Sequence, residues 1–93
     1  DMEASVTLFQ SLCRIGREAN AHLSEQVRKV EEAVHDKKLD LKKLLKKGAK
    51  DQKIEQAADK LGLDKKVFLF LVHSSTPPSR SKYESHVATF ANW

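Results

Sequence analysis

Cysteine, proline, glycine and aromatic residues are all scarce in this 93-residue chain. It holds one Cys, two Pro, three Gly, four Phe, one Tyr and one Trp. A single cysteine, Cys13, excludes an internal disulfide and a zinc site built from cysteines, which favours a reducing compartment and a cytoplasmic location. The glycines, Gly16, Gly48 and Gly62, are isolated from one another, so the sequence has no glycine-rich phosphate-binding loop.

Long apolar runs and catalytic motifs are also missing. No stretch approaches the roughly 20 apolar residues of a membrane span, and no secretory signal pattern is present. The histidines His22, His35, His73 and His86 include no pair four residues apart, the spacing that brings two imidazoles to one metal from one helix face. A chain of this length builds one modest core without a deep substrate cleft. We therefore expect no metal site, no cofactor, no membrane association and no enzymatic activity.

The length fits one domain over residues 1–93. The chain starts at Asp1 rather than at a methionine and stops at Trp93, directly after an apolar pattern. A fragment of a longer protein is one interpretation of these ends.

Apolar and small residues recur at intervals of four and three along the first third of the chain. This seam consists of Met2, Val6, Phe9, Cys13, Gly16, Asn20, Leu23, Val27, Val30 and Val34. The pattern predicts one long helix from about residue 3 to residue 35. Gly16 and Asn20 interrupt the seam at its middle, which indicates a close helix crossing at Gly16 and a hydrogen bond from Asn20 to a neighbouring element. A dimer formed through the same seam is a second interpretation, compatible with the first.

Positive charge is concentrated between Lys37 and Lys53. Eight lysines against two aspartates give this stretch a net charge of +6, whereas the whole chain carries +4. Asp40 as a cap and Gly48 as a left-handed end predict a short helix over residues 40 to 47. Three interpretations stay open, namely a solvated face, a surface for an acidic protein, and a nucleic-acid-binding face. The lysines of the last interpretation are Lys42, Lys43, Lys46, Lys47 and Lys50. No arginine or aromatic residue, which base recognition needs, is interleaved with them.

Residues 54 to 73 fit the helix-turn-helix pattern at most framework positions. We expect Asp51 and Asp64 to cap helices over residues 52 to 61 and 64 to 74, with Gly62 in the left-handed turn between them. A DNA-reading helix presents polar side chains outward, but the outward positions here are Leu69 and Phe70. An apolar helix of this kind is buried or contacts a partner's surface.

The last segment follows a stiff connector at Ser74 to Ser79, because Pro77 biases Thr76 away from helical angles. Beyond it, Tyr83, Val87 and Phe90 recur at four and three. This spacing predicts a helix over residues 80 to 92, which we expect to dock on the core of the chain.

Together these segments predict an all-α fold of four to five helices, with one long N-terminal helix packed on a helical pair and a C-terminal helix. The expected core consists of Phe9, Leu12, Ile15, Leu23, Leu44, Ile54, Leu61, Val67, Phe68, Leu71 and Phe90.

Several stretches, taken in order, resemble the helical part of formate dehydrogenase accessory proteins. These are Leu8-Phe9-Gln10 through Ile15, Leu39-Asp40-Leu41 through Gly48, Ala57-Ala58-Asp59-Lys60-Leu61-Gly62-Leu63-Asp64, Phe70-Leu71 and Pro78-Ser79. In that family the helical part leads, shortly after a tryptophan such as Trp93, into metal sites built from paired Cys-x-x-Cys motifs. None of those cysteines is present here, so no metal ligand carries over. The resemblance implies a chaperone-like protein that binds a dehydrogenase subunit during maturation.

The function predicted from these observations is a non-catalytic protein-binding module. The chain has more large apolar residues than a core of this size comfortably covers, and those expected at the surface are Leu69, Phe70, Tyr83 and Trp93. The partner is another protein or a second copy of the chain, bound through apolar helix faces. The alternative is a nucleic-acid-binding domain that uses the Lys37 to Lys53 face.

Overall fold

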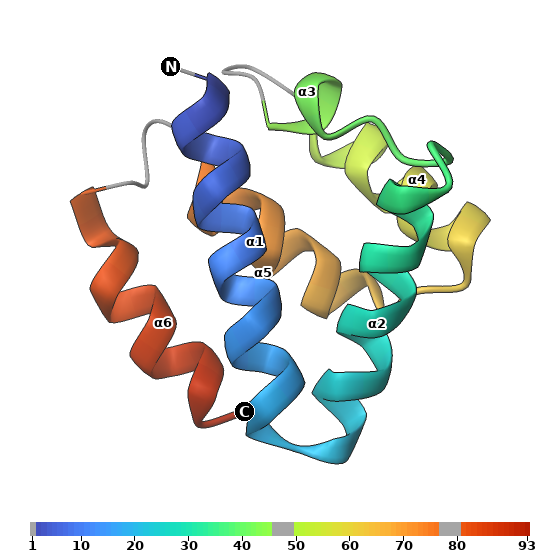
Figure 1. The fold of residues 1–93 in the computed structure, drawn as a ribbon. Helices are drawn as coiled ribbons and strands as arrows, with labels where there is room; N and C mark the ends of the chain where they lie inside the picture. The colour runs from blue at the N-terminus through green and yellow to red at the C-terminus, as the bar shows by residue number, and fades with distance from the viewer. Residues whose placement is uncertain (1, 46–49, 77–80) are drawn as a thin grey trace.

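The computed structural model describes residues 2–45, 50–76 and 81–93, and over these residues the fold is all-α, as the sequence predicted. The helices are α1 (Met2–Ala19), α2 (Ala21–His35), α3 (Leu41–Leu44), α4 (Asp51–Leu61), α5 (Lys65–Ser75) and α6 (Tyr83–Ala91). In Figure 1, α1 runs through the middle of the molecule, with α2 on one side, α6 on the other and α5 crossing behind it. The helix α1 therefore packs against α2, α5 and α6.

The predicted helix from residue 3 to residue 35 is wrong in one respect, because the chain folds back at Asn20. The backbone of Asn20 is extended, at φ −160° and ψ 171°, and its side chain accepts a hydrogen bond from the Leu23 N–H at 3.0 Å. Asparagine is among the best N-cap residues, so it starts a second helix. The hydrogen bond expected from Asn20 to a neighbouring element is instead this local cap.

This reversal packs the two halves of the apolar seam against each other. Phe9, Cys13, Leu23, Val27 and Val30 are all buried within the chain, so these seam residues form part of its own core.

The close crossing predicted at Gly16 is present. A Cβ atom at this position would lie 2.8 Å from Val27 Cγ2 and 2.8 Å from Phe90 Cε2. The glycine therefore allows α2 and α6 to approach α1 at the same level.

Two helices end in the same hydrogen-bonded turn, one with a glycine and one without. At the end of α4, Gly62 has φ 71° and the Leu63 N–H donates to the Ala58 carbonyl at 2.8 Å. At the end of α2, Lys37 has φ 61° and the Lys38 N–H donates to the Ala33 carbonyl at 2.9 Å. Both are Schellman motifs, in which a left-handed residue follows the helix.

Two of the three predicted N-cap residues are confirmed. Asp40 and Asp64 cap α3 and α5, because their carboxylates accept hydrogen bonds from the Lys42 and Lys66 N–H groups at 3.1 and 2.9 Å. Asp51 is not a cap, since α4 follows Lys50 and Asp51 lies inside its first turn. Its carboxylate contacts His73 Nε2 of α5 at 2.8 Å instead. The turn expected at Gly48 lies outside the described residues.

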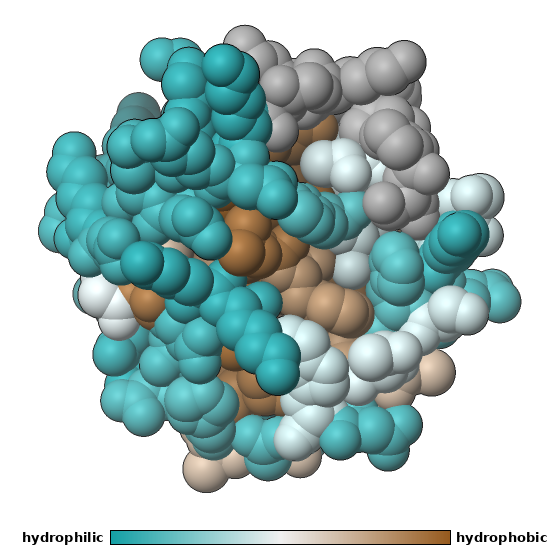
Figure 2. Space-filling model, turned by 180° about the vertical axis from the view of Figure 1, so that it is seen from behind, coloured by the Kyte–Doolittle hydropathy of each residue, from teal (hydrophilic) through white to brown (hydrophobic). Residues whose placement is uncertain are grey.

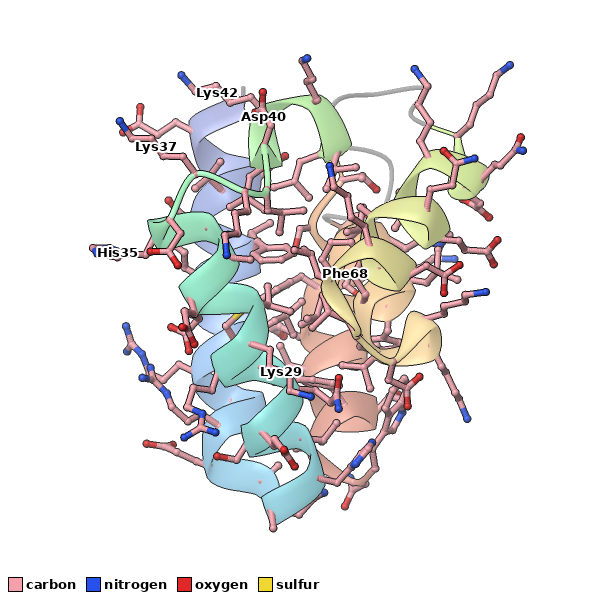
Figure 3. All side chains as sticks on the ribbon, turned by 90° about the vertical axis from the view of Figure 1, so that its right-hand side faces the viewer. Lys29, His35, Lys37, Asp40, Lys42 and Phe68 are labelled. Atoms are coloured by element: carbon pink, nitrogen blue, oxygen red, sulfur yellow. The ribbon has the colours of Figure 1, made fainter. Side chains whose placement is uncertain are left out.

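The core is close to the expected one. Two of the predicted members, Ile15 and Leu61, are only half-buried and pack against its edge. The others are buried, and further buried apolar residues join them, namely Cys13, Val27, Val30, Ala33, Leu39, Leu41, Leu45, Ala58, Leu63 and Val72. Figure 3 shows Phe68 in the interior, and the face opposite to that of Figure 1 has an apolar strip at its centre, bordered by hydrophilic side chains (Figure 2).

Candidate protein-binding surface

An aromatic cluster joins α5, α6 and Trp93, which lies two residues beyond the end of α6. The Phe70 ring stacks on the buried Phe90 ring, with centroids 5.3 Å apart and an interplanar angle of 16°. Trp93 lies against both, at 4.8 Å from Phe70 and 5.5 Å from Phe90. The helix α6 thus docks on the core, as the sequence predicted, and its docking fixes Trp93 on the surface.

Trp93 is the most exposed large apolar side chain in the described part of the molecule, at 38% of its full area. The Lys66 ammonium lies 5.2 Å from the centroid of its ring, a cation–π contact between the start of α5 and the tryptophan. Rings held in this way bind with little loss of side-chain freedom.

A cleft of about 600 Å³ opens beside this tryptophan, between the starts of α2 and α5. We call it the Trp93 cleft, and its lining residues are Asn20, His22, Leu23, Asp64, Lys66, Val67 and Trp93. The wall is mixed in character, because apolar side chains alternate with groups that donate or accept hydrogen bonds.

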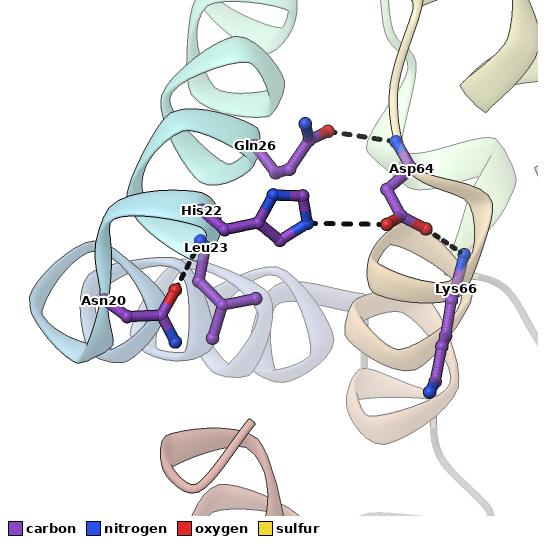
Figure 4. Close-up of polar contacts among 6 residues, drawn as sticks. All are labelled: Asn20, His22, Leu23, Gln26, Asp64 and Lys66. Carbon is purple, nitrogen blue, oxygen red and sulfur yellow. Dashed lines mark hydrogen bonds and ion pairs between the residues drawn. The ribbon is translucent and has the colours of Figure 1, made fainter.

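Asp64 organises the polar side of the cleft (Figure 4). Its carboxylate contacts His22 Nε2 at 3.5 Å and caps α5, while its N–H donates to the Gln26 side-chain oxygen at 2.9 Å. These contacts tie the start of α5 to α2 and hold the two walls of the cleft at a fixed separation. The residues His22, Gln26 and Lys66 were not predicted as site residues, whereas the cap signal at Asp64 and the prediction of Trp93 as a binding residue both pointed to this corner.

The structure brings together two of the four predicted protein-binding residues. Phe70 and Trp93 are in contact. Leu69 precedes Phe70 in the sequence, and consecutive residues of a helix point about 100° apart. Leu69 therefore points to a different side of α5 from Phe70. Tyr83 is also separate, because its hydroxyl donates to the Leu8 carbonyl of α1 at 3.3 Å, and burial raises the pKa of this phenol. Leu69, Phe70 and Tyr83 are half-buried, so the surplus of exposed apolar residues is smaller than expected.

Two lysines of the alternative prediction, Lys42 and Lys43, belong to α3, which lies at the end of the molecule away from the C-terminus (Figure 1). Lys42, Lys43 and Lys50 are exposed, whereas Lys46 and Lys47 lie outside the described residues. Figure 3 shows Lys37 and Lys42 extending away from the body of the molecule beside α3.

Cys13 is buried next to a smaller cavity of about 230 Å³, which His35 and Glu31 also line. Burial raises the pKa of the thiol to about 12, and the nearby Glu31 adds to the effect. A thiol in this state is protonated and unreactive at neutral pH. No cluster of three or more metal-ligating side chains occurs among the described residues.

Comparison with known protein families, curated proteins and solved structures gave no significant match. The resemblance to formate dehydrogenase accessory proteins therefore stays a prediction. Among the described residues, no helix combines the length and the apolar character needed to cross a bilayer.

Proposed function

We propose that the protein is a non-catalytic protein-binding module that receives an apolar segment of its partner in the Trp93 cleft. The observation that carries this proposal is an exposed tryptophan, fixed on the Phe70–Phe90 stack, at the edge of a cleft of about 600 Å³. Tryptophan is the residue type most enriched among those that dominate binding energy at protein interfaces.

The chemistry of the cleft supports a protein partner. Trp93 supplies the exposed apolar contact area above the buried Leu23 and Val67, and Asp64 and Lys66 stand beside it as polar groups. A protein interface combines an apolar centre with a polar rim in the same way. The 3.5 Å contact between His22 Nε2 and the Asp64 carboxylate and the hydrogen bond from the Asp64 N–H to Gln26 join both walls, so the cleft is formed before a partner arrives.

The partner is another protein or a second copy of the chain. A chaperone-like role in enzyme maturation is the version of this function that the sequence resemblance adds, and the single cysteine favours a cytoplasmic location.

The test is a selection of tryptophan-free helical peptides from a displayed library, followed by calorimetry with the purified protein. Trp93→Ala should weaken the selected peptides by at least about tenfold, as expected for an anchor residue. Lys29→Ala, which removes an exposed side chain of α2 outside the cleft, should leave binding unchanged. Because Trp93 is the only tryptophan, its emission should also shift to the blue when a peptide covers it. Equal affinity of wild type and Trp93→Ala would refute the proposal.

Self-association is measured separately by sedimentation over a range of protein concentrations. A dimer that Trp93→Ala dissociates would identify a second copy as the occupant of the Trp93 cleft. A dimer that survives the substitution would place that contact elsewhere on the molecule.

Nucleic-acid binding is the second candidate, and the gathering of exposed lysines at the α3 end favours it. Such binding would be independent of sequence and would weaken steeply with salt. The double variant Lys42→Glu with Lys43→Glu should abolish the shift of an oligonucleotide at low salt. Absence of any shift with the wild-type protein would remove this candidate.

A further inference from the structure

A groove of about 200 Å³ lies between α3 and α4, and it shares no residue with the Trp93 cleft. We call it the lysine groove, and it is lined by Lys38, Leu39, Asp40, Lys43, Leu44, Ala57, Lys60 and Leu61. The lining comes from three elements, namely the loop after α2, the short helix α3 and the second half of α4.

The floor of the lysine groove is apolar. Leu39 and Leu44 are buried beneath it, and Ala57 and Leu61 are half-buried at its side. The small side chain of Ala57 leaves open a space that a larger residue would fill. A volume of about 200 Å³ is enough for one or two aliphatic side chains of a ligand.

The rim carries three exposed amines, those of Lys38, Lys43 and Lys60. No ion pair to any of them is found within the described part of the chain. Asp40, which also lines the groove, and Asp59, the sequence neighbour of Lys60, have other partners. Asp40 accepts the Lys42 and Lys43 backbone N–H groups at 3.1 and 3.4 Å, and Asp59 pairs with Lys65 at 3.2 Å.

We propose that the lysine groove binds an acidic segment of a partner protein, with one or two aliphatic side chains on the apolar floor and carboxylates opposite the three amines. Charge complementarity favours an acidic ligand, because the rim presents three lysine amines around one aspartate, a net charge of 3 − 1 = +2. The apolar floor favours a peptide over a nucleic acid as the ligand. A nucleic acid would bring bases or phosphates to an apolar surface on which no aromatic or arginine side chain is available for stacking.

The probe is a fluorescein-labelled helical peptide with two leucines at positions i and i+4 and glutamates on both sides of them. Residues at this spacing share one helix face, so both leucines point to the same groove. Fluorescence anisotropy measures the affinity of the peptide at low and at physiological salt. Surface charge interactions are screened more strongly at the higher salt concentration. Two comparison peptides replace the leucines by alanine or the glutamates by glutamine, and each should bind at least about tenfold more weakly, because floor and rim contribute together.

Two double variants with the same change of charge separate the groove from the general positive field. Lys43→Glu with Lys60→Glu should weaken the peptide by at least about tenfold, since both amines stand on the rim. Lys29→Glu with Lys82→Glu changes two exposed lysines that do not line the groove, and it should cost less than about threefold. Equal losses in the two variants would overturn the proposal.

Ala57→Leu tests the apolar floor without any change of charge. Leucine is a good helix former, so the variant should keep its far-UV circular dichroism while losing most of the peptide affinity. Unchanged affinity in Ala57→Leu would overturn the proposal. So would displacement of the peptide by an equimolar oligonucleotide, or the absence of measurable peptide binding at low salt. Trp93→Ala should bind this peptide as the wild type does, so a failure of the Trp93 cleft and a failure of the lysine groove are distinguishable.

Discussion

Replacing Lys37 by glycine is expected to stabilise the protein. Lys37 occupies the left-handed position that follows α2, at φ 61°, whereas glycine occupies the equivalent position after α4, at φ 71°. The two turns have the same pair of hydrogen bonds, so the chain contains its own reference for the substitution.

The size of the effect follows from two opposing contributions. A residue with a Cβ atom costs roughly 1–2 kcal/mol in the left-handed region. Glycine avoids this cost, but its greater freedom in the unfolded chain destabilises by about 0.4–1 kcal/mol. The difference between these two ranges is about 0–1.6 kcal/mol, and its midpoint, a gain of about 0.8 kcal/mol in the free energy of unfolding, raises Tm by about 3–6 °C in a domain of this size.

The measurement is thermal unfolding of Lys37→Gly followed by far-UV circular dichroism, with Lys37→Ala as the control. Alanine removes the same charge but keeps the left-handed strain, so its Tm should stay close to that of the wild type. The reciprocal variant Gly62→Ala should lose a similar amount, because a Cβ atom there has open space and only backbone strain to meet. A Tm of Lys37→Gly no higher than that of Lys37→Ala would show that the turn does not impose the strain described.

Three further outcomes follow from the fold. Asn20→Ala removes the cap of α2 and should lower the free energy of unfolding by about 1 kcal/mol in urea denaturation, whereas an unchanged value would mean that packing alone sets the reversal. Gly16→Val forces a branched side chain against Phe90 and Val27 and should lower the free energy of unfolding by at least about 1–3 kcal/mol. The emission of Trp93 should change as α6 shifts, and an unperturbed emission would contradict the close crossing. Burial raises the pKa of Cys13 from 9.0 to about 12, so the folded state holds the proton more tightly than the unfolded state. This stability is fully present below pH 9.0 and should be lost as pH rises toward 12, and thiol labelling at neutral pH should be slow until urea unfolds the protein. Rapid labelling of the native protein would contradict the burial.

Periodicity and caps were enough to place most helices. The apolar spacing located α6 and, as one continuous helix, the stretch that forms α1 and α2, and Asp40, Gly62 and Asp64 marked ends that the structure has. The reversal at Asn20 was missed because the intervals of four and three continue across it without a slip. A seam of this kind is satisfied equally by a partner helix and by its own second half, so the spacing alone does not decide between them.

The site was less predictable, because it depends on which residues meet across helices. Trp93 was identified as an exposed apolar residue, but its contacts with Lys66 and Phe70 arise only when α6 docks beside α5. The left-handed backbone conformation of Lys37 could not be predicted from the sequence, since lysine has no preference for that region. The lysine groove joins Lys38 and Lys43 to Lys60 across two helices, a juxtaposition that no local pattern encodes.

The docking of α6 against α1 also determines when one side of α1 becomes buried during synthesis of the chain. Tyr83 bonds to the Leu8 carbonyl, and Phe90 fills the space at Gly16, so a helix made early receives its cover from residues made late. The α1–α2 hairpin joins neighbours in sequence and forms as soon as both have left the ribosome. The side of α1 that faces α6 has to wait until about residue 90 has been added. At elongation rates of about 5–20 residues per second, the side of α1 that later packs against α6 faces solvent, or a holding chaperone, for several seconds during the synthesis of each chain.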